Sequence, residues 1–174
     1  MKEILSGTLA IDLGNTNTVI AFQDQKDINS VLVEIPNITS SPGVIPTAVW
    51  FEEPSNISKI GISALKMRDD SNSDLFFHSN FKRLIGNSFE KINQKNILNP
   101  NECGEKFFQI LWASIPHKYK IKRLVLTAPI DTYKGYREWL INLCGRLSVD
   151  EIALVDEPTA ASLGINVPLS LIHI

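Results

Sequence analysis

The chain has 174 residues, of which 44% are hydrophobic and 21% are charged, and its formal net charge is −2 at pH 7. This length fits one ordinary domain core, and the near-neutral charge gives no electrostatic argument for a nucleic-acid or membrane-surface partner. No apolar run has the length of a membrane span, and Asp12 and Asn15 interrupt the only apolar stretch near the N-terminus. We therefore expect a cytoplasmic protein that binds neither nucleic acid nor membrane.

The first half of the chain favours short strands and turns. Apolar runs predict strands over Leu9–Leu13, Val19–Gln23, Val31–Ile35 and Thr47–Phe51, and a Ser/Pro/Gly-rich connection precedes the last of them. A brief pairing at Lys59–Ile60 and a short helix near Ser63–Met67 follow. The stretch from Arg68 to Asn101 is polar and carries few periodic signals apart from the cluster Phe81–Ile85.

Helical periodicity marks the second half. Apolar residues fall on one helical face at Phe107, Phe108, Leu111, Trp112 and Ile115, and again at Tyr136, Trp139, Leu140, Leu143, Cys144 and Leu147. Buried strands are predicted over Arg123–Ala128 and Ile152–Val155, and Pro158 fits the first turn of a further helix. Cys103 and Cys144 lie within the helical patterns and are interpreted as small core residues. The alternation predicts an α/β fold.

One carboxylate and one glycine directly follow the first apolar strand. After Asp12 and Gly14 come four small polar residues, Asn15, Thr16, Asn17 and Thr18. A tight turn there exposes backbone N–H groups to phosphate oxygens, and the amides and hydroxyls add donors. Asp12 suits a hydrated Mg²⁺ ion, which takes one or two carboxylates plus waters. The alternative is an ordinary β-hairpin, because Gly-Asn is a common turn pair.

A second carboxylate lies where a short strand runs into a helix. Residues 155–163 read Val-Asp-Glu-Pro-Thr-Ala-Ala-Ser-Leu, which puts Glu157 near a helix N-terminus, where a negative charge is stabilised. The alternative is that Glu157 only caps the helix. Neither the Gly-Lys-Ser/Thr phosphate loop nor a Gly-x-Gly-x-x-Gly pattern occurs.

Three further motifs lie between these two segments. The five motifs, in order, are Ile11–Thr18, Ile45–Val49, Phe81–Gly86, Leu124–Pro129 with Arg137 eight residues later, and Asp156–Ala161. In this order they resemble the nucleotide-binding domain of the seventy-kilodalton heat-shock chaperones (the DnaK type). The resemblance runs from about residue 9 to residue 166. It implies the ribonuclease-H-like first lobe of an actin-type ATPase, with residues 1–40 and 106–174 as its core and residues 41–105 as a small inserted subdomain.

The resemblance also implies site residues. Lys82, Glu157 and Asp12 would be catalytic, with Lys82 on the γ-phosphate and Asp12 and Glu157 holding Mg²⁺ through water. Gly14, Asn15, Thr16 and Asn17 would wrap the β- and γ-phosphates, and Pro129, Arg137 and Glu157 would couple the nucleotide state to a peptide-binding domain. Asn15 stands where the family has threonine, so its hydroxyl chemistry is gone. For Lys82 the alternative is a surface lysine.

The implied function is the ATP-binding lobe of an ATP-dependent folding chaperone, with ATP or ADP and Mg²⁺ as ligands. Unfolded polypeptides and co-chaperones would be partners only of the full-length protein. The family's second glycine-rich phosphate loop does not occur in these residues, so we expect the chain alone not to hydrolyse ATP. Two alternatives stay open: a sugar-kinase-like phosphotransferase of the same actin-like superfamily, and a non-hydrolysing nucleotide-sensing interaction protein. We expect the Asp12 and Glu157 carboxyls to lie within roughly 10 Å of each other.

Overall fold

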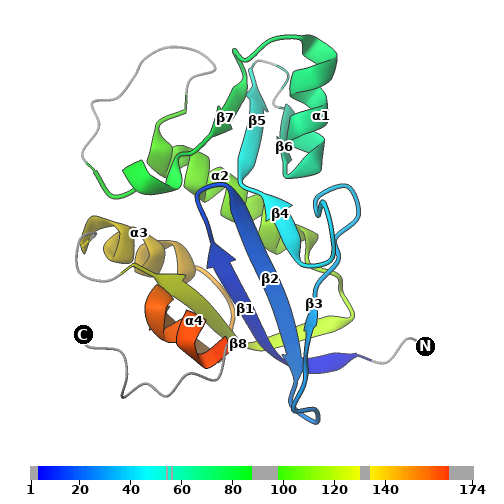
Figure 1. Cartoon of the computed structure of the whole chain (residues 1–174), viewed down its shortest axis with the longest axis vertical. Helices are drawn as coiled ribbons and strands as arrows, with labels where there is room; N and C mark the ends of the chain where they lie inside the picture. The colour runs from blue at the N-terminus through cyan, green and yellow to red at the C-terminus, as the bar shows by residue number, and fades with distance from the viewer. Residues whose placement is uncertain (1–3, 54, 56, 88–97, 130–133, 165–174) are drawn as a thin grey trace.

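The computed structural model describes residues 4–53, 55, 57–87, 98–129 and 134–164, which form two β-sheets and the helices that pack on them (Figure 1). The larger sheet has the strand order β3-β2-β1-β8-β9, and β4 also pairs with β2. Its strands are β1 (Leu5–Leu13), β2 (Asn17–Asp24), β3 (Ser30–Leu32), β4 (Val44–Pro46), β8 (Tyr119–Ala128) and β9 (Glu151–Asp156).

Strand direction in the larger sheet brings three strand ends to one edge. β1 pairs with β2 as an antiparallel hairpin, whereas β8 runs parallel to β1 and β9 runs parallel to β8. In register, Ile11 faces Leu126, and Ala128 faces Asp156. The carboxyl ends of β1, β8 and β9 therefore meet, and the residues that follow them lie side by side.

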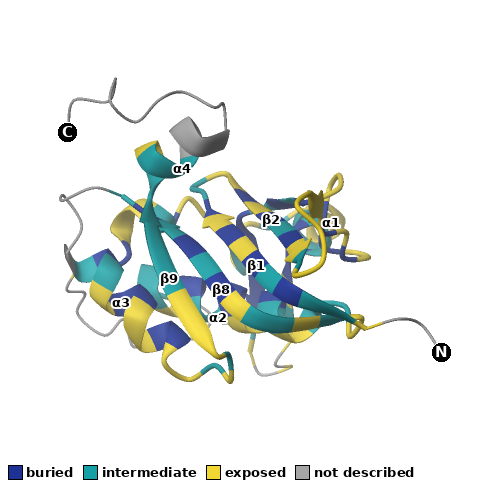
Figure 2. Ribbon diagram, turned by 90° about the horizontal axis from the view of Figure 1, so that it is seen from below, coloured by how far each residue is buried: buried dark blue, intermediate teal, exposed yellow. Residues whose placement is uncertain are grey.

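Two helices cover one face of the larger sheet. They are α2 (Pro100–Ser114) and α3 (Lys134–Cys144), while α4 (Glu157–Gly164) begins directly after β9 (Figure 2). α2 begins with a reciprocal cap: the Asn99 side chain accepts from the Glu102 N–H, and the Glu102 carboxylate accepts from the Asn99 N–H. Alternate residues of β1 meet the helices in one core, which includes Leu9, Ile11, Leu13, Phe107, Phe108, Leu111, Trp139 and Leu140.

The smaller sheet has its own core. β5 (Ala48–Glu52) lies between β6 (Ile57–Ile60) and β7 (Phe77–Ser79), and α1 (Ile62–Ser71) contacts β5 and β6. Trp50 is 2% exposed and packs edge-on to Phe76, with 5.4 Å between ring centroids. A short 3₁₀ helix, η1 (Lys82–Leu84), follows β7 and contacts α2. Hence residues 72–87, part of the segment predicted to carry few periodic signals, form a strand and a helical turn.

The predicted α/β class is confirmed, and the differences are local. The strand predicted to reach Ile35 ends at Leu32, because the Ile35 carbonyl accepts from the N–H groups of Ile38 and Thr39 and turns the chain. β4 and β7 were not predicted, since three-residue strands carry too little periodicity. Residues 165–174 lie outside the described residues.

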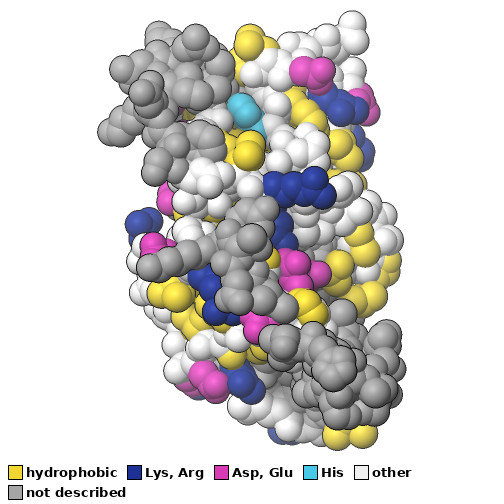
Figure 3. All heavy atoms as spheres, turned by 60° about the vertical axis from the view of Figure 1, so that its left-hand side comes forward, with side chains coloured by type: hydrophobic (Ala, Val, Ile, Leu, Met, Phe, Trp, Pro, Cys, Tyr) yellow, Lys and Arg dark blue, Asp and Glu magenta, His cyan; other side chains and the backbone are white. Residues whose placement is uncertain are grey.

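The surface and the thiols fit the composition. On the face shown in Figure 3, acidic and basic side chains are interspersed among the described residues. Within the described ranges, no helix is both long enough and apolar enough to cross a bilayer. Cys103 and Cys144 are free and buried. Burial raises the pKa of the Cys103 thiol to about 12 and that of Cys144 to about 11, so both act as core residues.

Leu111 tests the core on the helix-covered face. Its side chain is fully buried in α2, so Leu111→Ala leaves a cavity and lowers the free energy of unfolding by about 2–5 kcal/mol. Leu75→Ala is the matched control, because Leu75 is 59% exposed, and we expect a change within about 0.5 kcal/mol. Urea unfolding of both variants measures the difference. Equal effects would contradict the placement of α2 on the sheet.

Candidate functional site

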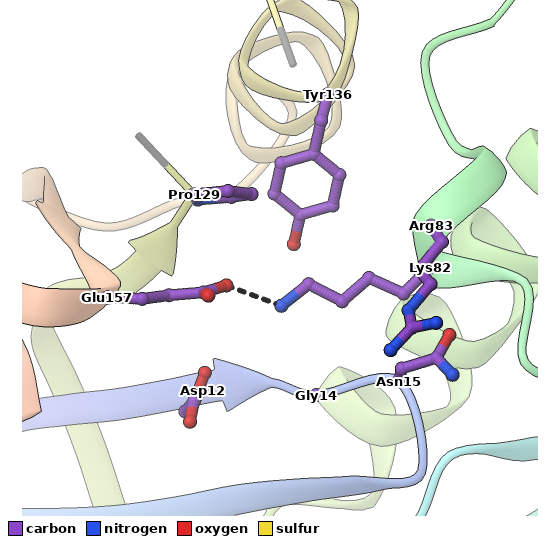
Figure 4. A pocket seen from close by; sticks show the side chains of 8 residues that line it. All are labelled: Asp12, Gly14, Asn15, Lys82, Arg83, Pro129, Tyr136 and Glu157. Atoms are coloured by element: carbon purple, nitrogen blue, oxygen red, sulfur yellow. Dashed lines mark hydrogen bonds and ion pairs between the residues drawn. The ribbon is translucent and has the colours of Figure 1, made fainter. Parts of the chain in front are cut away.

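A cleft of about 500 Å³ opens at the edge where β1, β8 and β9 end (Figure 4). The residues that line it are Asp12, Gly14, Asn15, Lys82, Arg83, Pro129, Tyr136 and Glu157. They come from the β1–β2 turn, from η1, from the end of β8, and from the first turns of α3 and α4. Residues far apart in the sequence therefore meet at one polar hollow.

The β1–β2 turn forms one wall of the cleft and depends on Gly14. A Cβ atom at this position would lie 2.1 Å from the Asn17 carbonyl oxygen, so only glycine fits without a shift of the backbone. The strands on either side pair antiparallel up to Leu13 and Thr18. The structure therefore shows the hairpin that was the alternative, while a phosphate-binding role of its turn stays a prediction that this geometry allows.

Asp12 is held at the end of β1 by the neighbouring strand. The Thr127 hydroxyl of β8 donates a hydrogen bond to Asp12 Oδ1. Asp12 is exposed and lines the cleft, so its carboxylate is accessible to a ligand. Parallel pairing of β1 with β8 produces this contact between residues 115 positions apart in sequence.

Lys82 and Glu157 form an ion pair across the cleft. Lys82 Nζ lies 2.6 Å from Glu157 Oε1, as the dashed line in Figure 4 shows. The Lys82 side chain is only 11% exposed and that of Glu157 is 39% exposed. Lys82 is therefore not a solvated surface lysine, and Glu157 does more than begin a helix. A half-buried ion pair adds little stability once its desolvation is counted, so stability alone does not explain these two residues.

The Lys82 segment is fixed to α2 and α3 on both sides. Phe81 and Ile85 are buried in the main core. Gly86 has φ 87° and its backbone packs on that of Gly135 in α3: a Cβ on Gly135 would lie 2.2 Å from the Gly86 carbonyl oxygen. The Gly86 N–H also donates to Asn101 Oδ1 at 2.8 Å. These contacts fix the backbone position from which the Lys82 side chain extends into the cleft.

Asn15 is oriented by a partner from the smaller sheet. Its Nδ2 donates to Asn80 Oδ1 at 2.9 Å, and Asn80 has a positive φ of 57° directly after β7. Asn15 Oδ1 is buried and has no hydrogen-bond partner among the described residues. Thr16 and Asn17, also predicted to wrap phosphates, are exposed on the turn and are not among the lining side chains.

The predicted coupling residues are divided between two places. Pro129 lines the cleft with Glu157. Arg137 lies outside the lining and pairs with Asp156 Oδ1, the residue before Glu157. Residues 130–133, between Pro129 and α3, lie outside the described residues.

Sequence reasoning missed Tyr136 and Arg83. Tyr136 was predicted only as part of the apolar helical face, and it is indeed 1% exposed. Its hydroxyl oxygen, however, is buried without a hydrogen-bond partner in the described part of the chain. Burial, followed by the negative charges of Glu157 and Asp12, raises the pKa of Tyr136 well above its usual range, so the hydroxyl stays protonated. A tyrosine in an otherwise apolar stripe was the available signal. For Arg83 the only available signal was its position next to Lys82 in the sequence.

The carboxylates of the cleft suit a hydrated cation better than a dry protein cage. Within the described ranges, no group of three or more His, Cys, Asp and Glu side chains could hold a metal. Asp12 and Glu157 nevertheless line the same cleft. Mg²⁺ commonly takes one or two carboxylates and keeps several waters, so this donor set fits it.

Fold and cleft together define a mixed α/β protein with a polar site at the carboxyl ends of parallel strands. No family model matches the chain. It is 31% identical over 166 residues to the chaperone protein DnaK of Mycoplasmopsis synoviae (strain 53), which covers 93% of this chain and 25% of that protein. It is 30% identical over 163 residues to the chaperone protein DnaK of Metamycoplasma hominis, covering 91% and 26%.

The chain is therefore a relative of the DnaK-type heat-shock chaperones, as its five motifs indicate. The chain spans about a quarter of the length of the curated relatives it matches.

Gly135 tests how the cleft is assembled. Gly135→Ala places a methyl group against the Gly86 backbone, so we expect η1 and α3 to separate and the free energy of unfolding to fall by about 1–3 kcal/mol. Gly145→Ala is the control, since its nearest neighbour would be 3.3 Å away at the Ile141 carbonyl oxygen. Urea midpoints compare the two. If the two variants unfold at the same midpoint, the close contact does not exist.

Proposed function

We propose that this chain is the ATP-binding lobe of a DnaK-type chaperone and that the cleft holds the terminal phosphates of ATP. The lobe would have the ribonuclease-H-like fold of an actin-type ATPase. The observation that supports this most strongly is the Lys82–Glu157 pair opposite the Gly14 turn, with Asp12 beside it. A cation, two carboxylates and a glycine turn with accessible backbone suit a metal-bound phosphate chain.

The proposed roles follow the side chains. The Gly14 turn and Asn15 bind phosphate oxygens, and exposed Thr16 and Asn17 contribute through the backbone of the turn. Asp12 and Glu157 hold Mg²⁺ through water. When bound, Mg²⁺ offsets the negative charge of the phosphates.

Lys82 and Glu157 act on the reaction itself in this proposal. Lys82 offsets negative charge that develops on the transferring phosphoryl group, and Glu157 positions the attacking water. Because Lys82 Nζ lies 2.6 Å from Glu157 Oε1, a phosphate that binds Lys82 must share or replace that ion pair. Ligand binding is thereby linked to Glu157.

We also propose that Pro129, Arg137 and Glu157 relay the nucleotide state to other parts of the full-length protein. Pro129 and Glu157 line the cleft, and Arg137 pairs with the residue next to Glu157, which supports the idea that they respond together. The division into a core of residues 1–40 and 106–174 and an insert of residues 41–105 is proposed likewise. The cluster of Ala48, Trp50 and Ala64 on one face of the smaller sheet supports it. The other face of that sheet packs in the main core, however, and β4 of this stretch pairs with β2.

Unfolded polypeptides and co-chaperones are proposed partners of the full-length protein, and a cytoplasmic location is proposed with them. The chaperone name of both relatives supports the first point. A non-hydrolysing nucleotide sensor is the second candidate. Asn15, which stands where the family has threonine, and the Lys82 charge already engaged by Glu157 favour it.

Single-turnover ATP hydrolysis by the full-length parent separates these candidates, and Lys82→Ala in the same protein tests the role of the lysine. A cation that acts on charge developing in the transition state lowers the rate when it is removed and leaves affinity nearly intact. We expect single-turnover ATP hydrolysis to slow by roughly a hundredfold or more, equivalent to about 3 kcal/mol, with ATP affinity changed only a few-fold. Lys59→Ala, at an exposed lysine of β6, is the control. Hydrolysis by Lys82→Ala at the parent rate would rule out the assigned role, and Asp12→Asn should in addition weaken Mg²⁺-dependent binding.

The 174-residue chain by itself should bind ATP weakly and should not turn it over. Enzyme clefts close around their substrate, and the chain spans about a quarter of the length of its curated relatives, so in this proposal further residues of the full-length protein complete the nucleotide site. Calorimetric titration with Mg-ATP, together with a phosphate-release assay, measures both properties. Micromolar affinity with steady phosphate release would show that the chain is a complete ATPase.

A further inference from the structure

The cleft contains a buried hydrogen-bond donor that the proposed function leaves unused. Tyr136 is 1% exposed, its hydroxyl oxygen is buried, and no described residue accepts a hydrogen bond from it. An unmade hydrogen bond of this kind destabilises a native protein. A buried polar group without a partner in a native structure needs an explanation, and one such explanation is that a ligand supplies the missing partner.

The surroundings of Tyr136 fix where this hydroxyl lies. Its ring packs on Trp139 with 5.7 Å between centroids, and the preceding residue, Gly135, is in backbone contact with Gly86. Lys82 Nζ lies 5.7 Å from the centroid of the ring. In Figure 4 the hydroxyl points into the cleft, toward the Lys82–Glu157 pair. The donor is therefore held rigidly beside the cation.

We propose that the Tyr136 hydroxyl donates a hydrogen bond to the terminal phosphoryl group of a nucleoside triphosphate, and so makes the cleft discriminate triphosphates from diphosphates. This inference rests on the proposed function, which places the terminal phosphate at Lys82. Tyr136 thereby becomes a specificity residue, because it touches the ligand group in which the two nucleotides differ.

The chemistry of the hydroxyl favours an anionic oxygen as its partner. Its raised pKa keeps it a neutral donor at physiological pH, so it adds a hydrogen bond without adding charge. Lys82 is already engaged by Glu157 at 2.6 Å, and a second, uncharged donor helps a phosphate compete for that position. Asn15 Oδ1, the other buried cleft atom without a partner, is an acceptor as placed and suits a water or a ligand hydroxyl instead.

Tyr136→Phe in the full-length protein tests the proposal by calorimetry with a non-hydrolysable ATP analogue and with ADP, both with Mg²⁺. Loss of a hydrogen bond to a charged group weakens binding about ten- to a hundredfold. We expect that loss for the ATP analogue and none for ADP. Tyr119→Phe is the matched control, because Tyr119 lies at the far end of β8, away from the cleft.

Thermal melting provides the second measurement. Replacing an unpaired buried hydroxyl by hydrogen leaves stability unchanged or higher, so ligand-free Tyr136→Phe should melt at or above the parent temperature. The upward shift of its melting temperature with the ATP analogue should be smaller than that of the parent. A lower ligand-free melting temperature would assign the hydroxyl a structural role and overturn the proposal.

The remaining outcomes separate this proposal from the one on which it rests. If the parent binds nucleotide and Tyr136→Phe binds the ATP analogue equally well, Tyr136 does not touch the ligand, and the proposed function stands. Equal losses for both nucleotides would overturn the assignment to the terminal phosphate. If the parent binds neither nucleotide, the proposed function fails and this inference fails with it.

Discussion

The parallel pairing of β1 with β8 and of β8 with β9 is the constraint on which the rest of the cleft depends. Parallel strands end at the same edge of a sheet, and ligand sites of open α/β sheets lie beyond those ends. Asp12 ends one strand, Pro129 follows the second and Glu157 follows the third. Asp12 thus becomes a neighbour of two residues more than a hundred positions downstream without any loop having to reach far.

Lys82, the fourth residue of the cleft, does not follow a strand of the larger sheet, and packing contacts hold it in place instead. Buried Phe81 and Ile85 anchor its segment in the main core, and the contact between Gly86 and Gly135 brings that segment against α3. Both glycines are needed at this crossing, because a side chain on either would meet backbone atoms within about 2.2 Å. Packing between two backbones therefore decides whether the cation reaches the carboxylate of Glu157.

The sequence was sufficient to predict the class of fold and most of the cleft. Alternating periodicities located the long strands, and the order of five motifs brought Asp12, Gly14, Lys82 and Glu157 into one hypothesis. It could not reveal that Lys82 is 11% exposed, because its burial arises from α3, about fifty positions downstream. Nor could it decide whether the turn at Gly14 only joins two strands, since the observed hairpin is compatible with a phosphate-binding role and does not require one.

Tyr136 was missed for a related reason. Helical periodicity places a tyrosine on an apolar face, and this one is buried there as predicted. Periodicity says nothing about where the far end of a long side chain points, and here the buried hydroxyl points toward the cleft.

Short strands were missed because three residues hold less than two full alternations of the strand period.

A crystal structure of the full-length protein with Mg²⁺ and a non-hydrolysable ATP analogue tests the central claim most directly. The account predicts the phosphates in this cleft, with Lys82 Nζ moved from Glu157 toward the terminal phosphoryl group and the Gly14 turn against the phosphate chain. Phosphates bound elsewhere, with the Lys82–Glu157 ion pair unchanged at 2.6 Å, would contradict it.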